Sequence, residues 1–102
     1  MNADTAKTIR EVVGQIDYEK IILFGSQATG RASNRSDHDL MIILKETLSV
    51  PEKMRLSAFL RREFARKGID ADIIIKSNTE VEYYRHKIGN VVKSALEEGI
   101  AI

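Results

Sequence analysis

Three aspartates at the ends of apolar segments are the residues best placed to do chemistry. Asp37 and Asp39 stand two residues apart at the start of the apolar run 40–44, and Asp72 lies inside the run 71–75. Side chains at positions i and i+2 of a strand point to the same face, so Asp37 and Asp39 come close together and repel. A divalent cation relieves such repulsion, and hard oxygen donors without thiols favour Mg²⁺ or Mn²⁺ over Zn²⁺.

Asp72 completes a three-carboxylate cluster if its strand neighbours that of Asp39. An acid within an apolar strand is expensive unless it is paired or bound to a metal. Asp70 shares the strand parity of Asp72 and is the alternative third ligand, although it is nearer the Gly68 turn, where solvent can explain it. Asp37 and Asp39 could instead be turn formers. Magnesium takes part of its ligand set from substrate phosphates, so such a cluster predicts phosphoryl or nucleotidyl transfer.

Gly25 and Ser26 directly follow the apolar run 20–24 and are the candidate nucleotide-binding residues. Glycine lets backbone N–H groups approach a phosphate, and the serine adds a hydroxyl donor. An ordinary strand-ending turn is the alternative interpretation. Gly25 and Gly30 have the spacing of a P-loop, but the next two residues are not Lys followed by Ser or Thr, which excludes that motif.

Hydrophobic periodicity predicts the order helix, strand, strand, helix, strand, helix. Strands are expected over the apolar runs 20–24, 39–44 and 71–75, and a first helix carries the spaced apolar residues of 9–16. Capping-box pairs predict where the later helices begin: Ser49 with Glu52, and Ser77 with Glu80. Gly89 can divide the last helical segment into two. The expected fold class is α/β or α+β, with a small mixed sheet of three or more strands flanked by helices.

Composition narrows the class of protein. A length of 102 residues with 43% hydrophobic content predicts a single domain over 1–102. The absence of cysteine excludes disulfides and thiol catalysis. A formal net charge of +1 gives no strong nucleic-acid signal. Because there is no signal-peptide core and no apolar run long enough to span a bilayer, we expect no membrane association and a cytoplasmic location.

The glycine loop and the aspartate pair together resemble a known signature. Gly25-Ser26, a gap of ten residues and Asp37-x-Asp39 are similar to the motif of the DNA polymerase β-like nucleotidyltransferases. The fuller string, from Gly25 through Gly30 to Ser36-Asp37-His38-Asp39-Leu40, resembles the minimal nucleotidyltransferase (MNT) branch. Thr29 stands where members often carry Arg, and Arg35 stands where an acidic residue is common.

The resemblance implies a role for each matching residue. Asp37, Asp39 and Asp72 would be catalytic metal ligands, while Gly25 and Ser26 would contact the triphosphate. The implied cofactor is Mg²⁺, as two ions that Mn²⁺ can replace, and ATP is the implied substrate. Many MNT proteins are encoded beside a HEPN-domain ribonuclease toxin and act as its antitoxin, some by transferring AMP to a tyrosine hydroxyl. The implied partner is therefore a HEPN toxin.

Two other functions stay open at this point. The chain could be a non-catalytic antitoxin that neutralises its partner by contact alone, using a face of its last helix. It could also be a nucleic-acid-binding subunit through Arg61, Arg62 and other basic residues, although these charges are interspersed with acids and a solvated surface is the favoured interpretation. Homo-oligomerisation is left open.

Overall fold

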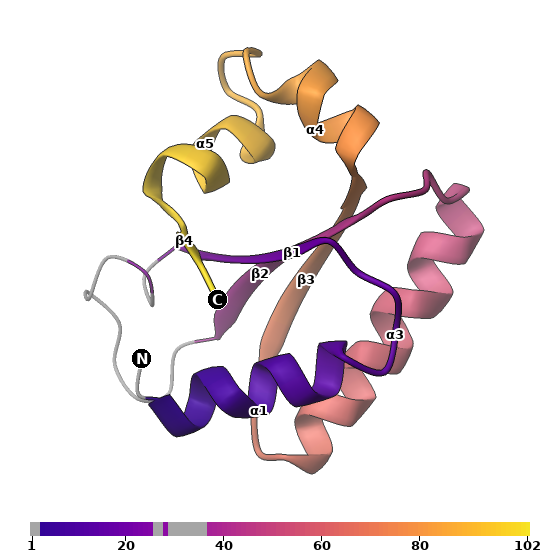
Figure 1. The fold of residues 1–102 in the computed structure, drawn as a ribbon, viewed down its shortest axis with the longest axis vertical. Helices are drawn as coiled ribbons and strands as arrows, with labels where there is room; N and C mark the ends of the chain where they lie inside the picture. Colours follow the sequence, from indigo (N-terminus) through magenta and orange to yellow (C-terminus); the bar gives the residue numbers. More distant parts are fainter. Residues whose placement is uncertain (1–2, 26–27, 29–36) are drawn as a thin grey trace.

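A four-stranded mixed sheet organises the chain in the computed structural model, which describes residues 3–25, 28 and 37–102 (Figure 1). The strands, in the sheet order β3-β2-β1-β4, are β1 (Lys20–Phe24), β2 (His38–Leu44), β3 (Ala71–Ser77) and β4 (Ile100–Ala101). β1 is antiparallel to β2 and β4, whereas β2 and β3 are parallel. The three longer strands and the mixed sheet confirm the sequence prediction. β4 was not predicted, because two residues are too short to show a pattern.

Helices cover both faces of the sheet. They are α1 (Ala3–Val13), α3 (Val50–Arg66), α4 (Asn78–Tyr84) and α5 (Val91–Glu98). Figure 1 shows α1 and α3 on one face and α4 and α5 on the other. α1 ends earlier than predicted, although Ile16 still packs on the core. Gly89, at φ 81°, lies between α4 and α5 and divides the last helical segment as predicted.

The central strand β2 is buried on both sides, which explains its unbroken apolar run. Leu40 and Ile42 contribute to the cluster under α1 and α3, while Met41 and Ile43 contribute to the cluster under α4 and α5. All four are at most 3% exposed. Alternate residues therefore fill opposite cores, as expected for a strand covered by helices on both faces.

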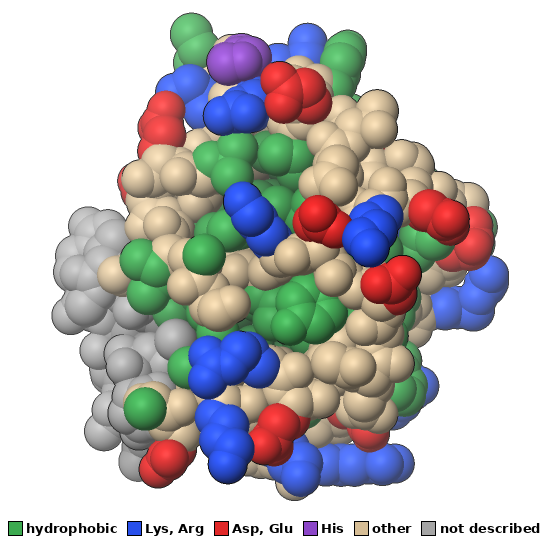
Figure 2. Space-filling view, viewed as in Figure 1, with side chains coloured by type: hydrophobic (Ala, Val, Ile, Leu, Met, Phe, Trp, Pro, Cys, Tyr) green, Lys and Arg blue, Asp and Glu red, His purple; other side chains and the backbone are tan. Residues whose placement is uncertain are grey.

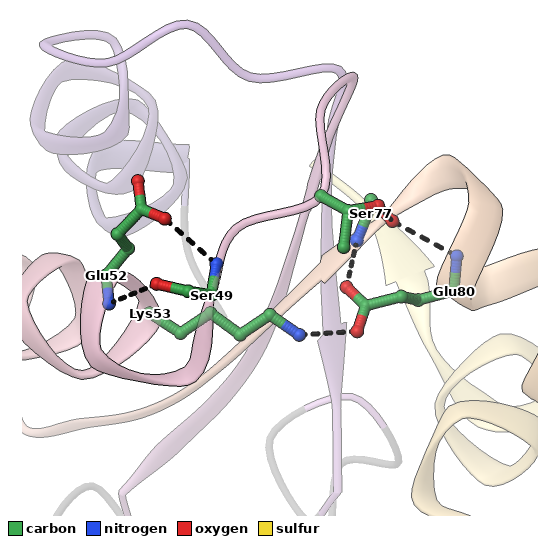
Figure 3. Close-up of polar contacts among 6 residues, drawn as sticks. Ser49, Glu52, Lys53, Ser77 and Glu80 are labelled. Carbon is green, nitrogen blue, oxygen red and sulfur yellow. Dashed lines mark hydrogen bonds and ion pairs between the residues drawn. The ribbon is translucent and has the colours of Figure 1, made fainter.

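Both predicted capping boxes form. Ser49 Oγ accepts from Glu52 N–H while the Glu52 carboxylate accepts from Ser49 N–H, and Ser77 and Glu80 make the same reciprocal pair (Figure 3). Lys53 joins the two helix starts by donating to the Glu80 carboxylate. These contacts anchor α3 and α4 at the same end of the sheet.

The Lys53–Glu80 pair is largely buried, with side chains 19% and 20% exposed. Burial alone would raise the pKa of Glu80. Hydrogen bonds from Lys53 and from Ser77 N–H, with the charges of Lys53 and Lys76, outweigh it and hold the pKa below its ordinary 4.5. A carboxylate with a lowered pKa stabilises the fold above its unfolded-state pKa, and that stability is lost as the pH falls through the folded-state pKa.

Lys53→Met will therefore lower the free energy of unfolding by about 1–3 kcal/mol at neutral pH, because it leaves the Glu80 carboxylate without its hydrogen-bonding cation. The loss should shrink as the pH falls below the ordinary pKa of Glu80. Urea unfolding at about pH 7 and about pH 3 measures both effects. The matched control is Lys93→Met, which opens the more exposed Lys93–Glu97 pair and should cost about 0.5 kcal/mol or less. Equal losses for the two variants would contradict this prediction.

Across the described ranges, none of the helices combines the length and the apolar content needed to cross a bilayer. On the face shown in Figure 2, acidic and basic side chains are interspersed around an apolar centre. That distribution agrees with a solvated surface rather than with a single-sign basic patch on this face.

Candidate active site

The pairing of β2 with β3 brings two of the predicted aspartates together. Asp39 is the direct register partner of Asp72 in the parallel pair, so both side chains start from the same face. This is the sheet face of Met41 and Ile43, which α4 and α5 cover further along β2. Asp37 lies two residues before Asp39 and has the same parity. The strand adjacency on which the prediction for Asp72 depended is thus present.

Asp72 and Asp37 both lie within electrostatic reach of Asp39. Burial raises the pKa of Asp39, and the negative charges of Asp72 and Asp37 raise it further, while the nearby His38 acts in the opposite direction. Asp70 is not paired with Asp39 in the sheet register. It instead precedes β3, and its carbonyl accepts from His38 N–H at 2.9 Å. The geometry therefore favours Asp72 over Asp70 as the third acid.

Gly25 lies directly against the Asp39 carboxylate. Its φ is +71°, a left-handed conformation that residues with a Cβ rarely adopt, and an added Cβ would overlap Oδ2 of Asp39. The turn after β1 and the acid on β2 thus require glycine at this position for two separate reasons. Ser26, the other predicted nucleotide-binding residue, lies outside the described residues, as do Thr29 and Arg35.

Arg61 of α3 contacts the third aspartate. Its Nη2 donates to Oδ1 of Asp72 at 2.9 Å, and the two side chains are 53% and 56% exposed. Together with Asp37 and Asp70 they line a surface pocket of about 230 Å³. From the sequence, Arg61 was interpreted as a solvated surface charge. The pairing was missed because it joins a helix to the edge strand and has no signature in local spacing.

The spacing and the donor chemistry of these carboxylates bear on whether they can bind a metal ion. Among the described residues, no three His, Asp or Glu side chains are gathered closely enough to hold an ion as they stand. One oxygen of Asp72 accepts from Arg61. The donors are hard oxygens, and Asp39 carries an unfavourable charge that a cation would relieve. By the chemistry of its donors the set fits a hydrated divalent ion, with one oxygen of Asp72 engaged by Arg61.

Comparison with known proteins decides the family. A family model described as polymerase beta, nucleotidyltransferase, matches residues 7–98 of the chain. The chain belongs to this nucleotidyltransferase family. That match spans every element carrying the three aspartates and Gly25, and it confirms the family that the glycine loop and the aspartate pair indicated. No curated protein sequence matched the chain.

Solved structures share the fold of this nucleotidyltransferase. One is a toxin–antitoxin complex with AMP-PNP, with a TM-score of 0.63, 17% identity, and coverage of 93% of this chain and 69% of that chain. Another is named as a minimal nucleotidyltransferase, with a TM-score of 0.59, 23% identity, and coverage of 100% and 97%. A third, named as a nucleotidyltransferase from Sulfolobus solfataricus, has a TM-score of 0.59, 22% identity, and coverage of 95% and 74%.

The like charges around Asp39 predict that removing its charge, which this nucleotidyltransferase needs for activity, stabilises the metal-free fold. Because the pKa of Asp39 is raised, ionising it in the fold costs stability as the pH rises above its ordinary 3.8. Asp39→Asn should raise the midpoint of thermal unfolding of the metal-free chain by about 1–5 °C at neutral pH, as relief of a like-charge contact. Thermal melts over a pH series measure it. A lower midpoint for Asp39→Asn at every pH would contradict the prediction.

Proposed function

We propose that this nucleotidyltransferase transfers AMP from ATP to a tyrosine hydroxyl of a partner HEPN-domain toxin, and so acts as its antitoxin. The observation that carries the proposal is the direct pairing of Asp39 with Asp72 across β2 and β3, beside Gly25. Asp37 extends the same cluster. A toxin–antitoxin structure with AMP-PNP contains a chain of similar fold, which supports the choice of nucleotide and partner.

Each residue has a defined task in the proposed reaction. Asp37 and Asp39 would hold Mg²⁺, which Mn²⁺ can replace, and would orient the triphosphate through it. Gly25 lets the backbone of the turn approach the phosphates, with Ser26 as the accompanying hydroxyl donor. When bound, two Mg²⁺ ions would supply the positive charge that lowers the pKa of an acceptor hydroxyl and offsets the charge of leaving pyrophosphate. Asp72 would be the third metal ligand, on the side of the acceptor hydroxyl.

The chemical step is an in-line displacement at phosphorus. The acceptor oxygen forms a bond to the α-phosphorus of ATP while the bond from that phosphorus to the bridging oxygen of the β-phosphate breaks. Pyrophosphate leaves, and the hydroxyl proton passes to the Asp72 carboxylate. In the proposed reaction the acceptor hydroxyl belongs to the partner protein.

The test is co-purification with the product of any adjacent gene, followed by intact-mass measurement after incubation with ATP and Mg²⁺. The proposal predicts a mass increase of one adenylyl unit per modified tyrosine on the partner and none when EDTA is present. Asp37→Ala or Asp39→Ala should abolish the increase. Neutralisation of the partner by both variants, without any mass change, would instead establish a non-catalytic antitoxin.

A further inference from the structure

The Arg61–Asp72 pair is the contact in the site that a metal must displace. This inference rests on the proposed function, in which the metal needs the carboxylate of Asp72. In the structure, Oδ1 of that carboxylate accepts from Arg61 at 2.9 Å. Asp72 lies on β3, the edge strand, and its side chain is 56% exposed. Arg61 reaches it from α3, which packs on the opposite face of the sheet from the one that Asp39 occupies.

The pair has a clear physical reason in the metal-free chain. Asp39 and Asp72 are direct register partners, and Asp37 is two residues before Asp39, so like charges lie close together when no cation is bound. A guanidinium beside Asp72 offsets part of that charge. Because both partners are about half exposed, solvent screens the pair, and its contribution is small enough for a divalent ion to displace it.

We infer that Arg61 is a positioning residue that acts through Asp72: it substitutes for the metal in the ligand-free chain and gives up Asp72 when the ion binds. Arg61 then competes with the metal for one carboxylate and so weakens the affinity of the site for the metal. Removing the guanidinium should tighten metal binding. Exposed pairs of this kind have a strength that corresponds to an affinity change of about two- to five-fold.

The test is a titration of the chain with Mn²⁺, with free Mn²⁺ followed by electron paramagnetic resonance. Arg61→Gln should lower the dissociation constant about two- to five-fold, whereas Arg61→Lys, which keeps a cation, should stay closer to the wild type. Arg62→Gln is the matched control. It removes the same charge from the next helical position, about 100° around the helix axis, and should change the dissociation constant less.

A double-mutant cycle distinguishes direct competition from a general charge effect. In an Asp72→Asn background, Arg61→Gln should have no more effect than Arg62→Gln, because the contact is already lost. Equal effects of the two arginines, an effect that persists without Asp72, or weaker Mn²⁺ binding by Arg61→Gln would overturn the inference. If Asp39→Asn loses Mn²⁺ binding while Arg61→Gln matches the wild type, only the inference fails. If Asp39→Asn binds Mn²⁺ normally, the proposed metal site itself fails.

Discussion

Asp39→Asn will reduce AMP transfer by about 10³-fold or more while the chain remains folded. Asp39 is the carboxylate flanked by both other acids, with Asp72 beside it in the register and Asp37 two residues before it. Asp39→Asn removes the carboxylate that lies beside both Asp72 and Gly25, and charge stabilisation of this kind supplies much of the rate of phosphoryl and nucleotidyl transfer. Label transfer from α-labelled ATP to the partner, with circular dichroism as a check of folding, measures the effect.

Asp70→Asn is the matched control for that prediction. Asp70 lines the same surface pocket as Asp37 and Asp72 and has the same parity as Asp72, but it precedes β3, whereas Asp72 is the register partner of Asp39. Transfer by Asp70→Asn should therefore stay within a few-fold of the wild type. If Asp70→Asn is as inactive as Asp39→Asn and Asp72→Asn is active, the third acid has been assigned to the wrong residue.

Gly25→Ala will impair both stability and transfer. The left-handed conformation at φ +71° penalises any residue with a Cβ by about 1–2 kcal/mol, and the new methyl group would also overlap Oδ2 of Asp39. We expect a total loss of about 2–4 kcal/mol in the free energy of unfolding and a fall of about 10²-fold or more in transfer, since Asp39 must move. Urea unfolding and label transfer on the same preparation separate the two effects.

Two other glycines allow the strain and the contact to be separated. Gly68 and Gly89 have φ values of +74° and +81°, and a Cβ at either would meet nothing within 4 Å. Gly68→Ala and Gly89→Ala should therefore show the conformational cost alone, with transfer nearly unchanged. If Gly25→Ala costs no more stability than these two variants and keeps its activity, Gly25 does not support the Asp39 carboxylate.

Local patterns in the sequence predicted most of the fold. Both capping boxes were identified from two serine–glutamate spacings, and the buried strands from their apolar runs, because these signals depend on neighbours within a few residues. The pairing of Asp37 with Asp39 was predictable for the same reason. The placement of Asp72 needed the parallel register of β2 and β3, which no local pattern specifies.

Two tertiary contacts at the site could not be predicted from local sequence patterns. Arg61 and Asp72 are eleven residues apart and meet only because α3 packs beside the edge strand. The overlap between a Cβ at Gly25 and the Asp39 carboxylate likewise follows from the antiparallel pairing of Phe24 with Asp39. Such tertiary contacts determine the positions and the charged neighbours of the carboxylates, whereas the sequence pattern indicates only which acids form the site.

The most direct test of the central claim is where Mn²⁺ binds on this nucleotidyltransferase. Paramagnetic broadening of backbone amide signals, recorded on the ¹⁵N-labelled chain with substoichiometric Mn²⁺ and ATP, reports that location without a partner protein. We predict that broadening centres on Gly25, Asp39 and Asp72, and that it disappears in Asp39→Asn. Broadening centred on another part of the chain, or unchanged by Asp39→Asn, would contradict the assignment of these aspartates as the metal and nucleotide site.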